Sequence, residues 1–236
     1  MWLRQLFDRE TWTYTYLIAD PATREAALVD PVLEQVERDL QLLQELGLTL
    51  RYSVDTHVHA DHITGTGKLR ALTGCLGVVP AGAQVDCADW LVQDGEVIQV
   101  GAIPIQAIAT PGHTDSHMAY WVNHTHVLTG DALFIRGCGR TDFQSGSAGT
   151  LYDSITQRLF TLGDEVWVYP GHDYRGQTIS TIGEEKRWNP RLAGRSRQEF
   201  IDFMNSLDLP DPQKIMEAVP ANQQCGQVAR VEMLGT

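Results

Sequence analysis

The sequence predicts an α/β fold in which mixed β-sheets are covered by helices. Strand-like segments alternate with amphipathic segments of helical period along the 236 residues. Several strand-like segments end in histidine or aspartate beside a turn-forming glycine or proline. Because active sites of layered α/β domains collect at such sheet edges, we expect one domain over residues 1–236 with its site at this edge.

The N-terminal part predicts a hairpin, a helix and a strand. Residues 12–18 and 26–31 are rich in β-branched, aromatic and other apolar side chains and are separated by a turn that contains proline. In residues 32–46, apolar side chains recur at helical spacing until a glycine ends the run. We expect a strand at 50–55 and a second helix at 63–72.

The rest of the chain continues the alternation. Strands are expected at residues 76–79, 96–100, 103–110, 117–122, 126–129 and 165–169. The fourth and fifth of these form a hairpin, and a helix at 150–162 precedes the last. From about residue 178 to residue 236 we expect a short helical extension. The residues predicted to form its buried side are Phe200, Phe203 and Met204.

One short stretch, residues 56–62, carries the strongest chemical signal. Its sequence is Thr-His-Val-His-Ala-Asp-His, which places four strong metal ligands within six residues. Three imidazoles and a carboxylate that close together cannot all enter an apolar core without a large desolvation cost. The stretch follows the expected strand at 50–55, so the strand would carry it to the sheet edge. We therefore predict a metal site there.

Three further candidate ligands follow other predicted strands: His113, Asp131 and His172. Imidazole and carboxylate ligands suit zinc, iron, manganese or nickel, and the lack of a nearby thiolate argues against a closed structural zinc site. Two arrangements remain open. Two metals could share Asp131 as a bridge, as in hydrolases that activate water between ions. Alternatively, two histidines and one carboxylate could hold a single iron with three open positions.

The composition excludes some partners. The formal net charge of −12 disfavours a nucleic-acid backbone as the main partner, because phosphate binding needs a basic footprint. No apolar run is long enough to span a bilayer, so we expect no membrane partner. The first residues lack the basic start, apolar stretch and cleavage site of a secretory signal. We expect a cytoplasmic protein.

The four cysteines, Cys75, Cys87, Cys138 and Cys225, are scattered and contain no Cys-x-x-Cys pair. Such a pattern is typical of reduced thiols and not of a disulfide framework. We therefore expect all four to be free.

The pattern His-x-His-x-Asp-His, followed by Gly-His, Gly-Asp and a second Gly-His, resembles the metallo-β-lactamase superfamily. The four blocks occur in the order of that superfamily and span most of the chain. The resemblance implies an αββα sandwich, in which two mixed β-sheets pack face to face and helices flank them. It does not name a reaction, because one fold hosts many.

Three finer motifs resemble those of the persulfide (sulfur) dioxygenases, the family of the ethylmalonic encephalopathy protein. They are Thr-Gly after the ligand cluster, Gly-Cys-Gly-Arg-Thr-Asp-Phe-Gln at 137–144, and Ala-Val-Pro-Ala-Asn at 218–222. Glyoxalase II usually has Gly-Gly after the cluster and aromatic residues after Gly-Cys-Gly-Arg. Its longer glutathione-binding helical domain also has no room in this chain.

The resemblance implies one Fe(2+) per chain, held by His57, His113 and Asp131, which would also be the catalytic residues. Other polar residues would surround the iron and orient its ligands and waters. These are His59, Asp61, His62, His172 and Asp173. The implied reaction takes glutathione persulfide, O2 and water to sulfite and glutathione, and the family suggests a homodimer.

Glutathione carries two carboxylates, so its pocket in an acidic protein needs local cations. Arg140, beyond Asp131, and Arg175, beyond His172, are placed to supply them, and Tyr174 could add a hydroxyl donor. Thr114 completes the expected substrate-binding residues.

Two alternatives remain open at this point. One is a glyoxalase II-like hydroxyacylglutathione hydrolase with two zinc ions. The other is a metal-bearing sensor or scaffold that binds persulfides without turnover. Metal content and persulfide-dependent O2 uptake separate all three.

Overall fold

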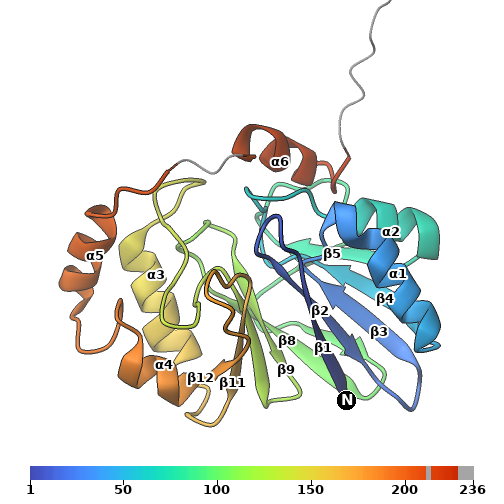
Figure 1. Ribbon diagram of the computed structural model, residues 1–236, viewed down its shortest axis with the longest axis horizontal. Helices are drawn as coiled ribbons and strands as arrows, with labels where there is room; N and C mark the ends of the chain where they lie inside the picture. Colours follow the sequence, from blue (N-terminus) through green and yellow to red (C-terminus); the bar gives the residue numbers. More distant parts are fainter. Residues whose placement is uncertain (211–213, 228–236) are drawn as a thin grey trace, which may run out of the picture.

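Two β-sheets lie face to face between two layers of helices in the computed structural model, which describes residues 1–210 and 214–227 (Figure 1). The inner faces of the sheets share one apolar core. In it, Ile18 and Val54 of the first sheet belong to the same buried cluster as Ile105 and Leu128 of the second. The expected αββα sandwich is therefore confirmed.

The two sheets contain six strands each. The first sheet consists of β1 (Trp2–Phe7), β2 (Tyr14–Ala19), β3 (Glu25–Val29), β4 (Thr49–Val54), β5 (Leu76–Pro80) and β6 (Trp90–Val92). The second consists of β7 (Val97–Val100), β8 (Ile103–Ala109), β9 (Met118–Val122), β10 (His126–Gly130), β11 (Trp167–Pro170) and β12 (Ser180–Thr181). Both are mixed. The pairs β3–β4, β4–β5, β5–β6 and β10–β11 are parallel, and the remaining neighbours are antiparallel.

Most helices flank the two sheets as outer layers, whereas α6 lies across one edge of the sandwich (Figure 1). The helices are η1 (Leu33–Gln35), α1 (Val36–Glu45), α2 (Thr66–Thr73), α3 (Ala148–Ser154), η2 (Ile155–Leu159), α4 (Ile182–Trp188), α5 (Arg197–Asn205) and α6 (Ile215–Asn222). Helices α1 and α2 lie beside the first sheet, and α3, α4 and α5 lie beside the second. None of the helices in the described part of the chain is long and apolar enough to cross a membrane.

Strand β2 shows how the sequence produces these layers. All six of its residues are buried. Because successive side chains of a strand point to opposite faces, Tyr16 and Ile18 enter the core between the sheets, while Leu17 packs with Val36 and Leu43 of α1. A strand covered on both faces reads as a continuous apolar and aromatic run, which is the signal that predicted it.

The structure differs from the sequence prediction at several elements. Strand β1 was not predicted, because its burial is incomplete and its side chains are mixed; pairing with β2 at the sheet edge decides its conformation. The short strands β6 and β12 were also missed. The predicted helix at 63–72 begins only at Thr66, because Val32 bridges Thr64 and the Thr64 amide donates to the Asn222 side chain.

The predicted C-terminal extension contains β12 and helices α4, α5 and α6. Its apolar side packs on α3 and η2: Phe200 and Met204 are buried in the same cluster as Leu151 and Ile155, and Phe203 is partly buried against it.

The expectation that all four cysteines are free was wrong. Cys87, in the connection between β5 and β6, forms a disulfide with Cys225, which lies 138 residues later. Cys75 and Cys138 are free and buried. Sequence spacing reveals only local pairs, whereas this pair depends on the path that brings α6 back across the molecule.

The loop after β8 depends on a glycine. Gly112 has φ +135°, and a Cβ there would lie 2.3 Å from the backbone nitrogen of Leu151 in α3. Gly47 also has a positive φ, +61°, but faces open space. Both positions disfavour a side chain, but only Gly112 adds a backbone collision.

We expect Gly112→Ala to destabilise the protein by about 2–5 kcal/mol, from backbone strain of about 1–2 kcal/mol and overpacking of about 1–3 kcal/mol. Gly47→Ala should cost only the strain, about 1–2 kcal/mol. Urea unfolding of both variants measures the difference. Equal losses would show that the approach of α3 does not restrict residue 112.

Candidate metal centre

Four strands deliver side chains to one edge of the sandwich. His57 follows β4, His113 follows β8, Asp131 follows β10 and His172 follows β11. His113 Nε2 lies 3.4 Å from Asp131 Oδ2, and His172 Nε2 lies 3.5 Å from Asp131 Oδ1. The His57 and His113 rings are 4.9 Å apart between centroids. The structure thus brings together residues that are more than 100 positions apart.

Three groups of described residues could each hold a metal ion, and the third, Asp30, Asp55 and His59, shares His59 with the second. The other two consist of residues predicted from the sequence. One set is His57, His113 and Asp131; the other is His59, Asp61 and His62. In each set the possible ligand atoms lie within 4.8 Å of one another. Asp173, also predicted for this region, is buried and accepts hydrogen bonds from the amides of the turn that follows it.

Several ligand atoms at this edge are buried and have no hydrogen-bond partner among the described residues. They are His57 Nε2, His59 Nδ1, His62 Nε2 and Asp131 Oδ1. A buried polar atom without a partner is costly, and native proteins rarely keep several side by side. Nitrogen and carboxylate donors at this spacing fit a zinc or iron ion, so the residues present fit a metal cofactor.

In the first set, a neighbouring group holds the Nδ1 atom of each histidine ring. His113 Nδ1 donates to the Arg140 carbonyl oxygen over 2.7 Å, and His57 Nδ1 lies 2.9 Å from Thr56 Oγ1. These bonds turn the Nε2 atoms of both rings towards the centre, as partners of metal-binding histidines generally do.

The other set is held by carboxylates. His59 Nε2 lies 3.0 Å from Asp30 Oδ1, and His62 Nδ1 lies 2.9 Å from Asp61 Oδ2. Burial alone would lower the pKa of His59, but the facing carboxylates of Asp30, Asp61 and Asp55 raise it to about 9. For His57, burial and the neighbouring histidines lower the pKa well below its ordinary value.

Two further residues organise the edge, and sequence reasoning missed the first of them, Asp30. Asp30, at the end of β3, accepts from the Thr56 amide over 2.7 Å as well as facing His59. The second is His117, at the start of the predicted strand 117–122, which accepts from the Asp131 amide over 3.0 Å; burial lowers its pKa to about 3. The signal that could have identified Asp30 is the Asp-Pro directly after β3. Because β3 and β4 are parallel neighbours and end together, Asp30 lies beside the loop that follows β4.

A cavity of about 640 Å³ opens beside the first set. His113, Asp131 and His172 line it, together with the predicted substrate residues Arg140, Tyr174 and Arg175. Arg136, Arg191 and Lys214 add three further cationic side chains that the sequence reading did not select. Thr114 is absent from this lining and is only 2% exposed, and its hydroxyl has no partner among the described residues.

Arg140 and Tyr174 have defined settings in the cavity wall. The Arg140 guanidinium binds both carboxylate oxygens of Asp142 at 2.7 Å, donates to the Pro210 carbonyl and lies over the Phe143 ring. Tyr174 stacks on His172 with 6.0 Å between ring centroids. Burial and neighbouring carboxylates raise the pKa of Tyr174, so its hydroxyl remains a proton donor.

Cys138 lies in the glycine-rich loop beside the cavity. Burial raises the pKa of its thiol, and Arg191 donates to its carbonyl oxygen. A protonated buried thiol is a poor nucleophile, so packing accounts for this side chain.

Comparison with known proteins agrees with this geometry. A family model described as the metallo-beta-lactamase superfamily matches residues 13–172. The mitochondrial persulfide dioxygenase ETHE1 of Bos taurus is 53% identical over 228 residues, which cover 95% of this chain and 88% of the relative. The crystal structure of ETHE1 from Myxococcus xanthus has a TM-score of 0.94 and 57% identity, covering 96% of this chain and 100% of that one. A hydroxyacylglutathione hydrolase of Rhodospirillum rubrum is more distant, at 36% identity over 84% of this chain and 75% of the relative.

The αββα sandwich and the histidine and aspartate ligands at its edge define a metal-binding protein of the metallo-β-lactamase superfamily. Within that superfamily the chain belongs to the persulfide dioxygenase family, because its relatives of that name match at about half identity over nearly its whole length.

We expect His113→Ala to lower the metal content of reconstituted protein at least about tenfold, because it removes one of three facing ligands. His124, exposed at the β9–β10 turn, supplies a matched control, and His124→Ala should keep full metal content. Metal analysis by mass spectrometry on folded protein measures both. Full metal content in His113→Ala would exclude His113 as a ligand.

Proposed function

We propose that this protein is an iron-dependent persulfide dioxygenase, which converts glutathione persulfide, O2 and water to sulfite and glutathione. The observation that carries the proposal is the set His57, His113 and Asp131 beside a cavity whose wall includes several arginines. In this set His57 Nε2 and Asp131 Oδ1 are buried without a hydrogen-bond partner among the described residues. Family membership supports the same reaction. One Fe(2+) per chain is the proposed cofactor.

Ferrous iron held by two imidazoles and one carboxylate supplies open coordination positions and redox chemistry. The protein's part is to hold the ligands and to place the persulfide. The Arg140 carbonyl and the Thr56 hydroxyl orient His113 and His57. We assign His59, Asp61, His62, His172 and Asp173 to the surroundings of the iron, where they fix its ligands and waters by hydrogen bonds.

The cavity wall supplies partners for the two carboxylates of glutathione. Arg140 and Arg175 are the proposed cationic contacts, and Tyr174 offers a hydroxyl donor next to His172. Placing the persulfide sulfur beside the ligand set replaces an improbable encounter of separate molecules by an ordered one. Thr114 is retained as a proposed substrate-side residue through its position next to His113, although its side chain is buried.

The rival function is a hydroxyacylglutathione hydrolase with two zinc ions, since every ligand for two sites is present. Metal analysis combined with an oxygen electrode separates the two. We expect one iron per chain and O2 uptake that requires persulfide. Two metals per chain with hydrolysis of S-lactoylglutathione would replace the proposal by its rival. Full iron loading without O2 uptake would favour a sensor that binds persulfide without turnover.

We expect Arg140→Ala to raise KM for glutathione persulfide about tenfold, the effect of losing one charge-assisted hydrogen bond of about 1.5 kcal/mol. Iron content should change little. Arg158→Ala is the control, because Arg158 pairs with Asp94 on the surface and lies outside the cavity lining. Steady-state kinetics on both variants gives the answer. Lost iron with unchanged KM would remove Arg140 from the substrate site.

Assembly and compartment belong to the same proposal. We propose one domain with a helical extension, a homodimer in the cytoplasm, and no nucleic-acid or membrane partner. The Bos taurus relative is named mitochondrial, so fractionation of the source cells is informative. Light scattering on the purified protein tests the dimer.

A further inference from the structure

The C-terminal segment returns across the edge of the sandwich that carries the ligands. Helix α6 lies over the upper edge in Figure 1, on the side where the loop after β4 emerges. In this segment Asn222, Cys225 and Gly226 all contact the loop that contains the histidine cluster or the start of α2.

Asn222 uses its whole carboxamide on this loop. Its Nδ2 donates to the carbonyl oxygens of His59 and His62 over 2.9 and 2.8 Å, and its Oδ1 accepts from the Thr64 amide over 2.8 Å. The side chain is almost fully buried. Three hydrogen bonds from one planar group to three backbone sites within six residues fix the course of the loop.

The backbone beyond Asn222 holds the same region. The Cys225 carbonyl accepts from the Gly67 amide over 2.9 Å, at the start of α2. Gly226 lies so close to Thr64 that a Cβ at residue 226 would come within 2.1 Å of the Thr64 carbonyl oxygen. Through these contacts with Thr64 and Gly67, the C-terminal segment also holds the end of the histidine loop.

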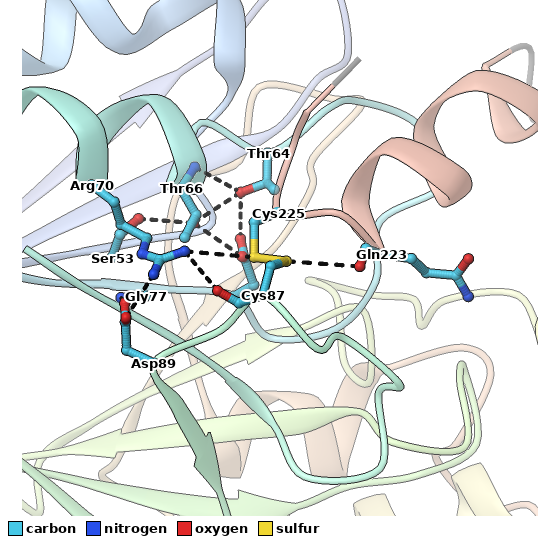
Figure 2. The surroundings of a disulfide bond; sticks show 10 residues. Ser53, Thr64, Thr66, Arg70, Gly77, Cys87, Asp89, Gln223 and Cys225 are labelled. Carbon is cyan, nitrogen blue, oxygen red and sulfur yellow. Dashed lines mark hydrogen bonds and ion pairs between the residues drawn. A yellow bond between two sulfur atoms is a disulfide. The ribbon is translucent and has the colours of Figure 1, made fainter. Parts of the chain in front are cut away.

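The disulfide attaches this support to the first sheet. Cys225 is bonded to Cys87, and Arg70 of α2 donates to the Cys87 carbonyl over 2.7 Å and to Asp89 over 2.6 Å. Figure 2 shows Arg70 between Asp89 and the two sulfur atoms. The covalent link lies three residues from Asn222, so it restricts where the carboxamide can go.

We propose that Asn222 is a positioning residue of the metal centre, and that the Cys87–Cys225 disulfide holds it against the loop. Asn222 touches neither metal ligand atoms nor substrate; it acts through the backbone of residues 59–64. The proposal concerns metal binding and does not depend on which reaction the metal supports.

Asn222→Asp is the sharpest variant. It keeps the shape of the side chain and the oxygen that accepts from the Thr64 amide. It replaces the Nδ2 group, which donates to the carbonyls of His59 and His62, by a carboxylate oxygen that cannot donate. The control is Asn123→Asp, which makes the same chemical change at an exposed residue. Asn123 lies in the turn between β9 and β10, at the end of β10 opposite Asp131.

The probe is Co²⁺, titrated into metal-free full-length protein and followed by its visible absorption spectrum. We expect Asn222→Asp to weaken Co²⁺ binding about 10- to 100-fold, the effect typical of partners that orient ligands, and to alter the spectrum. Hydrogen–deuterium exchange of residues 57–65 in the metal-free protein should rise. Asn123→Asp should change neither.

The disulfide is tested separately by replacing Cys87 and Cys225 together with serine, with Cys75→Ser as the control. We expect faster exchange at residues 57–65 and weaker Co²⁺ binding only in the double variant. It leaves Asn222 intact, so it tests the proposal even where Asn222→Asp does not fold. Wild-type Co²⁺ affinity and wild-type exchange in either folded test variant overturn the assignment, whether or not the enzyme oxidises persulfide.

Discussion

Unpartnered buried ligand atoms at the edge of the sandwich are the constraint on which the rest of this structure depends. Each buried donor or acceptor without a partner costs about 1–3 kcal/mol, and four lie side by side within the described residues. Three of the four atoms belong to the loop of residues 56–62, and their unmet hydrogen bonds oppose its folded conformation. Its geometry must therefore be imposed by groups outside the loop until a metal satisfies these atoms.

The imposed geometry comes from three directions. From the first sheet, Asp30 holds the Thr56 amide and hydroxyl as well as His59. Burial alone would raise the pKa of Asp30, but His59 and the hydrogen bonds from Thr56 lower it, so Asp30 remains an anion and a strong acceptor. From the second sheet, the Arg140 carbonyl holds His113. From the C-terminal segment, Asn222 holds the loop backbone.

Features that depend on residues close together in the sequence could be predicted, whereas features that depend on distant residues could not. The apolar and aromatic run of β2 and the hairpin of β9 and β10 are local patterns, and both were predicted. The predicted meeting of His113, Asp131 and His172 at the sheet edge is also observed, because each follows its own strand. Strand β1 was missed since its mixed side chains become a strand only by pairing with β2. Asp30 and the Cys87–Cys225 pair escaped notice for a similar reason: their partners are chosen by the fold and leave no local spacing.

The glycine-rich loop after Asp131 joins the metal ligands to the cavity wall. Gly139 donates its amide to the Asp131 carbonyl, and a Cβ there would lie 2.3 Å from that oxygen and 2.9 Å from His113 Nδ1. Only glycine allows the loop to wrap this closely around both ligands. The next residue, Arg140, then orients His113 through its backbone carbonyl and lines the cavity through its side chain. Because a substitution at Arg140 removes the side chain but keeps the carbonyl, it changes the cavity wall without removing the hydrogen bond to His113.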